Sequence, residues 1–369
     1  MNGRVLHLIP ALTEGGAERQ LSYLGAELTR RGWAVDVALN RGGPNLERLQ
    51  RAGVAIHNLG LQHNHDPRLL TRVHELVRSL TPDIVHTWLT QMDVVGGIVA
   101  RLNRVPWVLS ERTSSSGYQR TAKNFLRRSL GRYAAAIVAN SSRGLLYWMD
   151  GAHASVSRFV VPNGLPLSEI TACENGADPS LQPLKGEPFV LFVGRLSSEK
   201  DPATVLHAVE KLGPARRPRT VFCGEGPLAS ELALLSRSLG VEESVCLMGR
   251  LPTVWRVMKN AALMVSTSLI EGEPNAVLEA MACGCPLVVS DIPSHRDLLG
   301  DDALYAKPGD AVGFATAITS VLADPQEARQ RAERARLRTI DRSVEAMAAS
   351  YERIYADVIA RRRAAWRGP

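Results

Sequence analysis

Residues 268–291, SLIEGEPNAVLEAMACGCPLVVSD, contain the pattern that decides the fold. An apolar run at 262–266 precedes this stretch and a second lies within it at 286–290, which predicts a strand on either side of a helix. Pro274 suits the first helical position, and Gly284 suits the end of the helix. Two strands joined by a helix form a βαβ unit, whose ligand binds beyond the carboxyl ends of the strands, against the helix N-terminus.

Two glutamates lie eight positions apart in this stretch. We expect Glu271 to project from the loop into the crevice, and Glu279, one turn beyond Asn275, to face the same ligand. Free backbone amides between two carboxylates that accept hydrogen bonds from hydroxyl groups suit a ligand with a phosphate, a sugar and a ribose. The residues alone leave one alternative open, a surface helix with two solvated glutamates.

The stretch closely resembles the donor-sugar motif of the retaining glycosyltransferases of family 4, which have the two-domain GT-B fold. The resemblance implies that Glu271 contacts the transferred sugar and that Glu279 contacts the nucleotide ribose. Two positions depart from the family pattern, since Glu273 replaces an aromatic residue and Asp297, in DIPSHRDLL, replaces a glutamate after two glycines. The resemblance also places the intervening residues beside the donor, namely Gly272, Pro274, Asn275 and Ala276.

Length and pattern predict two domains. A chain of 369 residues exceeds the usual size of one domain, and its 45% hydrophobic content supports a core in each half. Apolar strands alternate with helical stretches, and their near-continuous Val, Leu and Ile runs are typical of parallel sheets covered on both faces. Together with the resemblance, this predicts an α/β GT-B fold of two Rossmann-like parallel-sheet domains that face each other across a cleft.

The domain boundaries follow from composition. Residues 1–170 form the predicted acceptor-side domain, 171–187 a linker rich in Gly, Pro and polar residues, and 188–342 the predicted domain that binds the nucleotide sugar. Residues 343–369 carry apolar side chains at helical spacing, and the resemblance implies that this helix packs back on the first domain. The strands expected in the first half lie at 4–10, 34–40, 54–58, 83–88, 107–111, 134–139 and 159–161.

Cations follow the first apolar strand of the second half. Gly194, Arg195 and Lys200 come after the run at 189–193, where a diphosphate would lie in this architecture. Cations at that position favour departure of a diphosphate, and the resemblance implies this role for Arg195 and Lys200. We therefore expect no metal and no cofactor besides the nucleotide-sugar substrate. The five cysteines are expected to be reduced core thiols, because Cys283-x-Cys285 lacks a second pair or histidines at the spacing of a zinc site.

Further donor contacts are predicted on both domains. Gly15 and Gly16 precede a helical stretch, and paired glycines allow backbone amides to approach a phosphate. They begin a GGAER sequence that is similar to the family signature, which implies a loop that closes over the donor from the opposite domain. The resemblance also implies that Glu225, in GEGP, lies near the nucleotide and that the backbone at Arg250 and Leu251 meets the base.

The acceptor side is less clearly marked. His86 lies near the end of the strand expected at 83–88, and we expect it to project into the cleft. The family often has a second histidine after the next strand, but this chain reads WVLSERTSSSG there. Glu111 and Arg112 stand close to that position and are the acceptor-side candidates, so the identity of an acceptor-side base stays open.

Positive charge is concentrated in the first half. The net charge is +7, and residues 112–149 contain seven basic side chains and no Asp or Glu. The segment NFLRRSLGRY at 124–133 predicts a helix with Phe125, Leu126, Leu130 and Tyr133 on one side and arginines on the other. Such a helix can bind anionic lipid headgroups or acidic substrates, or can simply cover its own core with a solvated face. No aromatic-interleaved basic groove occurs, so nucleic acid is not an expected partner.

These observations predict a retaining glycosyltransferase that moves a sugar from a nucleotide diphosphate, by family frequency UDP, to a hydroxyl of a saccharide acceptor. The basic first domain and the SERTS sequence favour a lipid-linked acceptor in polysaccharide or glycan assembly. The alternatives are a nucleotide-sugar epimerase on the same fold and a non-catalytic nucleotide-sugar-binding protein. No apolar run reaches the ~18–20 residues that span a bilayer, and the first residues leave no room for a signal peptide. We therefore expect a cytoplasmic protein, peripheral on the inner face of the cytoplasmic membrane.

Overall fold

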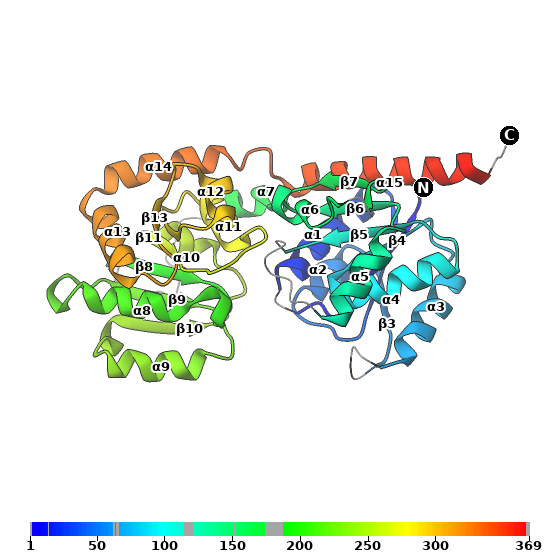
Figure 1. The fold of residues 1–369 in the computed structure, drawn as a ribbon. Coiled ribbons are helices and arrows are strands. Elements are labelled where there is room, and N and C mark those ends of the chain that lie inside the picture. The colour runs from blue at the N-terminus through cyan, green and yellow to red at the C-terminus, as the bar shows by residue number, and fades with distance from the viewer. Residues whose placement is uncertain are drawn as a thin grey trace. The chain divides into compact units, whose positions relative to one another are not determined.

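The computed structural model describes residues 2–13, 15–61, 63, 66–113, 121–150, 153–173 and 187–366. The chain divides into two compact units, 1–164 with 342–369, and 165–341. Each unit is a parallel β-sheet with helices on both faces (Figure 1), which confirms the prediction of two Rossmann-like α/β domains. The division falls after Gly164 and not after residue 170, because Leu165 and Ile170 are buried in the core of the second unit. Most of the predicted linker, residues 174–186, lies outside the described residues.

The first unit has a seven-stranded sheet with the order β3-β2-β1-β4-β5-β6-β7. Apolar runs predicted each of these strands, and the observed ends differ from the expected ones by a few residues. The strands are β1 Arg4–Leu8, β2 Ala34–Leu39, β3 Ala55–Asn58, β4 Ile84–Trp88, β5 Trp107–Glu111, β6 Ala136–Ala139 and β7 Ser157–Val160.

Helices cover both faces of this sheet. The first unit has two hydrophobic cores. The first core contains side chains of α1, α2 and α15, and the second contains side chains of α3 and α4. The apolar side chains that predicted the C-terminal helix by their spacing are buried in the first of these cores, namely Val344, Met347, Tyr351, Ile354 and Val358. The helices of the first unit are α1 Gly16–Arg30, α2 Leu46–Arg51, α3 Arg68–Leu80, α4 Leu89–Leu102, α5 Ala122–Gly131, α6 Ser142–Leu146 and α15 Val344–Trp366.

The second unit has a six-stranded sheet with the order β10-β9-β8-β11-β12-β13. Its strands are β8 Phe189–Val193, β9 Arg219–Cys223, β10 Val245–Gly249, β11 Leu263–Ser266, β12 Leu287–Ser290 and β13 Leu304–Ala306. The strand order reverses between β8 and β11, and ligands of open parallel sheets bind at such a switch point, beyond the carboxyl ends of the strands. The fold therefore directs attention to the loops that follow β8 and β11.

The helices of the second unit alternate with its strands, and short 3-10 turns connect several of them. The chain leaves β11 for α11, which begins at Asn275, so Pro274 directly precedes the helix and is not its first residue. Gly284 follows the helix with φ +68, a left-handed conformation that suits glycine, and so ends the helix as predicted. The elements are α7 Leu167–Ala172, η4 Ser198–Lys200, α8 Pro202–Lys211, η5 Pro214–Arg216, α9 Ala229–Ser238, η6 Glu242–Ser244, α10 Trp255–Asn260, α11 Asn275–Ala282, α12 Pro293–Leu299, α13 Ala311–Ala323 and α14 Pro325–Leu337.

None of the helices in the described part of the chain is both long enough and apolar enough to cross a bilayer.

Candidate active site

The loops after β8 and β11 are tied together at the switch point of the second sheet. The hydroxyl of Thr267 lies 2.9 Å from the carbonyl oxygen of Lys200 and 2.8 Å from that of Asp201. The backbone N–H of Leu269 donates to the carbonyl of Glu199 over 2.9 Å. These bonds join the end of η4 to the start of the Glu271 loop, so two segments far apart in sequence form one surface.

Lys200 and Glu271 form an ion pair on this surface. The Lys200 ammonium donates to Oε1 of Glu271, and the Ser268 hydroxyl donates to the same oxygen over 2.8 Å. Only 12% of the Glu271 side chain is exposed, so this carboxylate is not a solvated surface charge. The structure thus brings together two of the predicted donor-site residues, with opposite charges, and sequence reasoning missed the contribution of Ser268.

Glu279 is also enclosed. Its side chain is 2% exposed, and the indole N–H of Trp255 donates to Oε2 over 3.3 Å. The alternative of two solvated glutamates is therefore wrong for this chain. Trp255 comes from α10 and was not among the predicted site residues, although it is the one tryptophan in residues 165–341. A buried carboxylate that already accepts one N–H can hold a second hydrogen-bond donor in a fixed place.

The glycines of the GEGP sequence have a structural role beside the β8 loop. A Cβ atom on Gly224 would lie 1.9 Å from the carbonyl oxygen of Gly194, and one on Gly226 would lie 2.3 Å from that of Leu196. The backbone N–H of Leu196 donates to the carbonyl of Glu225 over 2.9 Å, while the Glu225 side chain is exposed. Close contact between the β8 and β9 loops therefore requires glycine at both positions.

The remaining donor-site candidates of the second unit lie at the ends of strands or at the start of a helix. Arg195 is exposed directly after Gly194, which is half-buried. Arg250 is exposed, and Leu251, half-buried, follows β10. The segment that leads into α11 is partly enclosed, with Gly272, Asn275 and Ala276 half-buried and Pro274 buried. Asp297, in place of the family glutamate, is exposed on α12.

On the first unit, Gly15 and Gly16 lie at the start of α1, as predicted. A Cβ atom on Gly15 would lie 2.0 Å from a carboxylate oxygen of Glu18. The Thr13 hydroxyl donates to the other oxygen of that carboxylate over 3.2 Å. The Glu of GGAER therefore folds over the end of the helix that would attract a phosphate, an arrangement that the sequence did not predict.

The prediction that His86 projects into an open cleft is wrong. Its side chain is fully buried, with Nδ1 2.6 Å from the Tyr355 hydroxyl and Nε2 2.7 Å from the Ser110 hydroxyl. Side chains alternate along a strand, and His86 faces the side covered by α15, as its neighbours Ile84 and Trp88 do. Burial holds the pKa of His86 well below its usual value, so this imidazole is neutral.

Glu111 is likewise not available to an acceptor. It is fully buried and accepts hydrogen bonds from Arg127 Nη1 over 2.9 Å, from the Trp148 indole over 2.9 Å and from the backbone N–H of Thr113 over 3.0 Å. Arg112 keeps some exposure. Its guanidinium donates to Asn163 Oδ1 over 2.6 Å and lies 5.0 Å from the centre of the Trp88 ring. Of the acceptor-side candidates, Arg112 alone presents its side chain at the surface.

The basic helix forms where predicted, as α5, but its apolar residues do not share one buried face, because Leu130 packs against the core while Phe125, Leu126 and Tyr133 are exposed. Arg127 is 1% exposed and pairs with Asp93 over 2.7 Å and with Glu111, whereas Phe125 is 75% exposed. The two buried carboxylates, one from α4 and one from the end of β5, hold the arginine inside. Arg120 lies outside the described residues.

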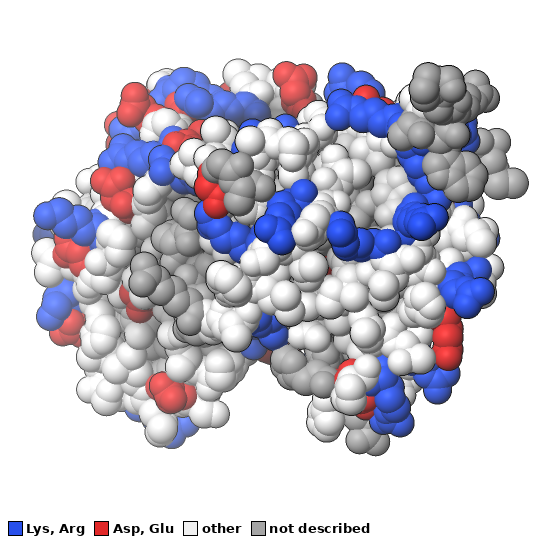
Figure 2. All heavy atoms as spheres, turned by 45° about the vertical axis from the view of Figure 1, so that its right-hand side comes forward, with Lys and Arg blue, Asp and Glu red and all other residues white. Residues whose placement is uncertain are grey.

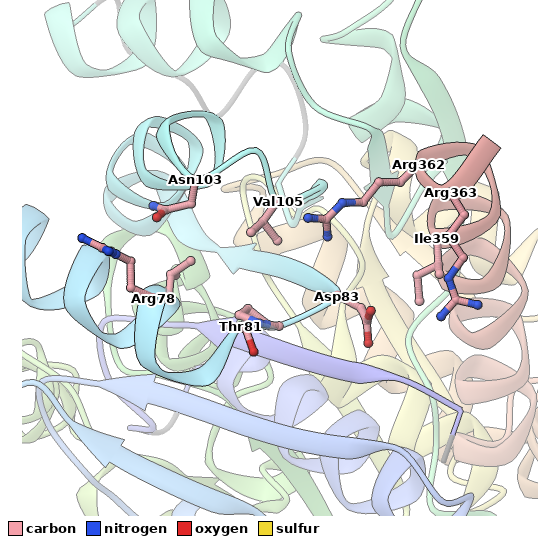
Figure 3. Close-up of a pocket in the computed structure, with 10 residues that line it drawn as sticks. Arg78, Thr81, Asp83, Asn103, Val105, Ile359, Arg362 and Arg363 are labelled. Carbon is pink, nitrogen blue, oxygen red and sulfur yellow. The ribbon is translucent and has the colours of Figure 1, made fainter. Parts of the chain in front are cut away.

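A separate cavity of about 610 Å³ lies in the first unit beside the amino ends of β4 and β5 (Figure 3). Arg78, Arg362 and Arg363 line it, together with Asp83, whose carboxylate accepts the backbone N–H of Arg4 over 2.8 Å. Arg78 and Arg363 belong to the last turns of α3 and α15, where cations stabilise the carbonyl ends of helices. Ligands of open parallel sheets bind beyond the carboxyl ends of the strands, whereas this cavity lies at the amino ends, so we do not assign it to the donor.

Among the described residues, no group of three His, Cys, Asp or Glu side chains is placed to hold a metal ion. Burial raises the pKa of the Cys283 thiol to about 12, which disfavours the thiolate form that binds metals.

The fold and the switch-point surface define a class. Two Rossmann-like units, one with a cation, a carboxylate and the start of α11 grouped beyond β8 and β11, are typical of GT-B enzymes that use nucleotide sugars. Two family models match the chain, the glycosyl transferase 4-like domain at residues 15–164 and the glycosyl transferases group 1 domain at residues 177–338. The chain belongs to the group 1 glycosyltransferases and is a transferase enzyme, which favours this reading over the epimerase and the non-catalytic protein.

Curated relatives are glycosyltransferases. The chain is 28% identical over 247 residues to the N-acetylgalactosamine-N,N'-diacetylbacillosaminyl-diphospho-undecaprenol 4-alpha-N-acetylgalactosaminyltransferase of Campylobacter jejuni, which covers 64% of this chain and 65% of that enzyme. It is 24% identical over 370 residues to a second enzyme of that organism, the GalNAc-alpha-(1->4)-GalNAc-alpha-(1->3)-diNAcBac-PP-undecaprenol alpha-1,4-N-acetyl-D-galactosaminyltransferase, which covers 96% of this chain and 99% of the enzyme.

A solved structure agrees on the fold. Anabaena Alr3699/HepE in complex with UDP-glucose has a TM-score of 0.82 and 20% sequence identity, and covers 97% of this chain and 100% of that one.

Proposed function

We propose that this enzyme transfers a sugar from a UDP-sugar to a hydroxyl of a lipid-linked saccharide, with retention of the anomeric configuration. The observation that carries the proposal is the joined surface after β8 and β11, where Lys200, Glu271 and the start of α11 converge. The names of the Campylobacter jejuni relatives, which act on undecaprenol-linked substrates, support the acceptor class. The UDP-glucose complex of the structural neighbour supports the donor class.

Each donor-site residue has a proposed task. Glu271 accepts hydrogen bonds from hydroxyls of the transferred sugar, and Glu279, held by Trp255, accepts from a ribose hydroxyl. Lys200 exchanges part of its contact with Glu271 for the diphosphate when the donor binds. Cations around a diphosphate stabilise the charge that grows there as the sugar departs.

The proposed reaction proceeds on one face of the sugar. The bond from the anomeric carbon to the diphosphate oxygen breaks, and the acceptor oxygen bonds to the same carbon from the same side. The acceptor proton passes to the departing diphosphate oxygen, so the step needs neither a protein nucleophile nor a metal ion. With His86 and Glu111 buried, this route gives a base for the acceptor hydroxyl without either residue.

Donor binding tests the first half of this proposal. Thermal unfolding is measured with a panel of UDP- and GDP-sugars, because a ligand that binds the native state raises the unfolding temperature. We expect a UDP-sugar to give the largest shift and Lys200→Met to remove most of it, while Lys211→Met, a surface lysine of the same unit, keeps it. A larger shift with a GDP-sugar would overturn the assignment of the nucleotide.

Location follows from the acceptor. An enzyme whose acceptor is anchored in a bilayer must work at the bilayer surface, so we place it at the inner face of the cytoplasmic membrane, as a peripheral protein.

A further inference from the structure

Helix α5 departs from an ordinary surface helix at residues 125–127. Arg127 is its largest buried side chain, whereas Phe125 and Leu126 are exposed. A helix that covers its own core buries apolar side chains and exposes charged ones. Here Asp93 and Glu111 hold the arginine inside, and the two apolar residues directly before it are directed to the outside.

A second pair of exposed apolar residues lies next to α5. Leu146 and Met149, at the end of α6 and just beyond it, are 60% and 58% exposed. Arg128 of α5 joins the two segments, because its guanidinium lies 4.7 Å from the centre of the Tyr147 ring and pairs with Asp150 over 2.6 Å. We call Phe125, Leu126, Leu146 and Met149 together the α5–α6 surface.

The charges around this surface are almost all positive. Asp150 is the one acidic residue between 121 and 150, and it already pairs with Arg128 and His153. Figure 2 shows the face of the first unit that carries α4 and α5 as a mainly white surface with blue side chains around it and few red ones. Besides Arg127 and Arg128, the stretch contains Lys123, Arg132 and Arg143, so basic side chains outnumber acidic ones five to one between 121 and 150.

We propose that the α5–α6 surface docks on an anionic lipid bilayer and inserts its four apolar side chains at the headgroup boundary. Apolar side chains with a cationic rim match such an interface, since the rim attracts the phosphates while the apolar groups leave water. Monomeric proteins rarely expose clustered large apolar residues without a binding role. The proposal deepens the proposed function, on which it rests for a lipid-linked acceptor, by naming the surface that meets the lipid.

The positive charge around the α5–α6 surface favours a lipid bilayer over a second copy of this chain as its binding partner. Two copies that pair through the same patch would bring the predominantly basic stretch between 121 and 150 of each chain toward that of the other, and like charges repel at contact. Anionic headgroups instead provide a continuous layer of opposite charge.

Vesicle flotation with the full chain tests the surface. Vesicles of phosphatidylcholine with 30% phosphatidylglycerol are compared with pure phosphatidylcholine, at low and high salt and without any nucleotide sugar. We expect at least tenfold stronger partition to the anionic vesicles, reduced at least tenfold by the double variant Phe125→Ser with Met149→Ser. The control is Leu234→Ser, an equally exposed leucine of α9 (63% exposed), which should partition as the wild type does.

A tryptophan reporter variant tests the same surface without relying on the serine variants being stably folded. The emission of Phe125→Trp should shift to shorter wavelength with anionic vesicles, while that of Leu234→Trp should not. Equal partition of the wild type and the double variant would overturn the proposal, as would a dimer in solution that the double variant disperses. The thermal-shift assay of UDP-sugar binding is carried out without lipid. If no UDP-sugar bound, that result would count against the proposed function but would not change the interpretation of the flotation experiment.

Discussion

Lys200 and Glu271, 71 positions apart in sequence, pair at the carboxyl ends of neighbouring strands β8 and β11. The cation assigned to the diphosphate and the carboxylate assigned to the sugar therefore hold each other in place before any donor binds. A bound nucleotide sugar would divide the pair between its two halves, with the diphosphate facing the ammonium and the sugar hydroxyls facing the carboxylate. The pair keeps both groups oriented and limits the cost of their partial burial.

The first prediction concerns Glu279, which is 2% exposed and accepts a hydrogen bond from Trp255. Glu279→Ala should weaken UDP binding by about 10- to 100-fold, because a hydrogen bond to a charged group contributes roughly 1.5–3 kcal/mol. Titration calorimetry with UDP measures the change. Glu231→Ala, an exposed carboxylate of the same unit, is the control and should bind as the wild type does. Unchanged affinity in Glu279→Ala would remove the ribose assignment.

The second prediction concerns Arg127. Arg127→Met leaves Asp93 and Glu111 buried without their cation, so the free energy of unfolding should fall by about 3–5 kcal/mol. Arg132→Met removes the same charge from an exposed position and should cost less than about 1 kcal/mol. Denaturant unfolding followed by circular dichroism compares the two variants. Similar losses in both would mean that the buried network contributes no stability.

The third prediction follows from the pKa of Asp93, which burial raises to about 6 although Arg127 opposes the shift. The folded state therefore binds this proton more tightly than the unfolded chain, whose pKa is about 4. Protonated Asp93 therefore stabilises the folded state. This contribution to the free energy of unfolding is fully present below about pH 4 and is lost as the pH rises through about 6. The wild type should lose on the order of 2–3 kcal/mol relative to Asp93→Asn across that range. A difference between the two proteins that stays constant with pH would contradict it.

The fourth prediction is that transfer persists in EDTA. Arg195 and Lys200 supply the positive charge that a metal ion would bring to the departing diphosphate. Initial rates in EDTA should match those in Mg²⁺ or Mn²⁺ within about twofold, since neither ion takes part. Loss of turnover on chelation, with recovery on adding either ion, would show that the metal-free mechanism is wrong.

Apolar runs predicted the strands of the first sheet and β8, β11 and β12 of the second, and Gly284 predicted the end of α11, because these features depend on neighbouring residues in the sequence. His86 was misplaced for a different reason. Its position at the end of β4 could be read from the pattern, but the face of the sheet that it occupies depends on α15, some 270 residues further along the chain (|i−j| = 269 to Tyr355).

Arg127 could not be predicted for a similar reason. A helical pattern places arginines on the solvent face unless buried carboxylates can pair with them. The carboxylates that pair with Arg127 lie 34 and 16 positions earlier in the sequence, at Asp93 and Glu111. The pairing of Lys200 with Glu271 likewise depends on which strands are neighbours. Residue types identified the donor-site candidates, whereas tertiary packing decides which of them meet.

Acceptor-dependent release of UDP tests the central claim most directly. The wild type is incubated with its best UDP-sugar, with and without an undecaprenyl-diphosphate-linked saccharide, and UDP is quantified over time. We predict release only when the acceptor is present, and a fall of at least about 100-fold in turnover for Glu271→Ala with UDP affinity nearly unchanged, because the carboxylate meets the sugar and not the nucleotide. Conversion of the UDP-sugar at the same rate without an acceptor, or full activity in Glu271→Ala, would contradict the account.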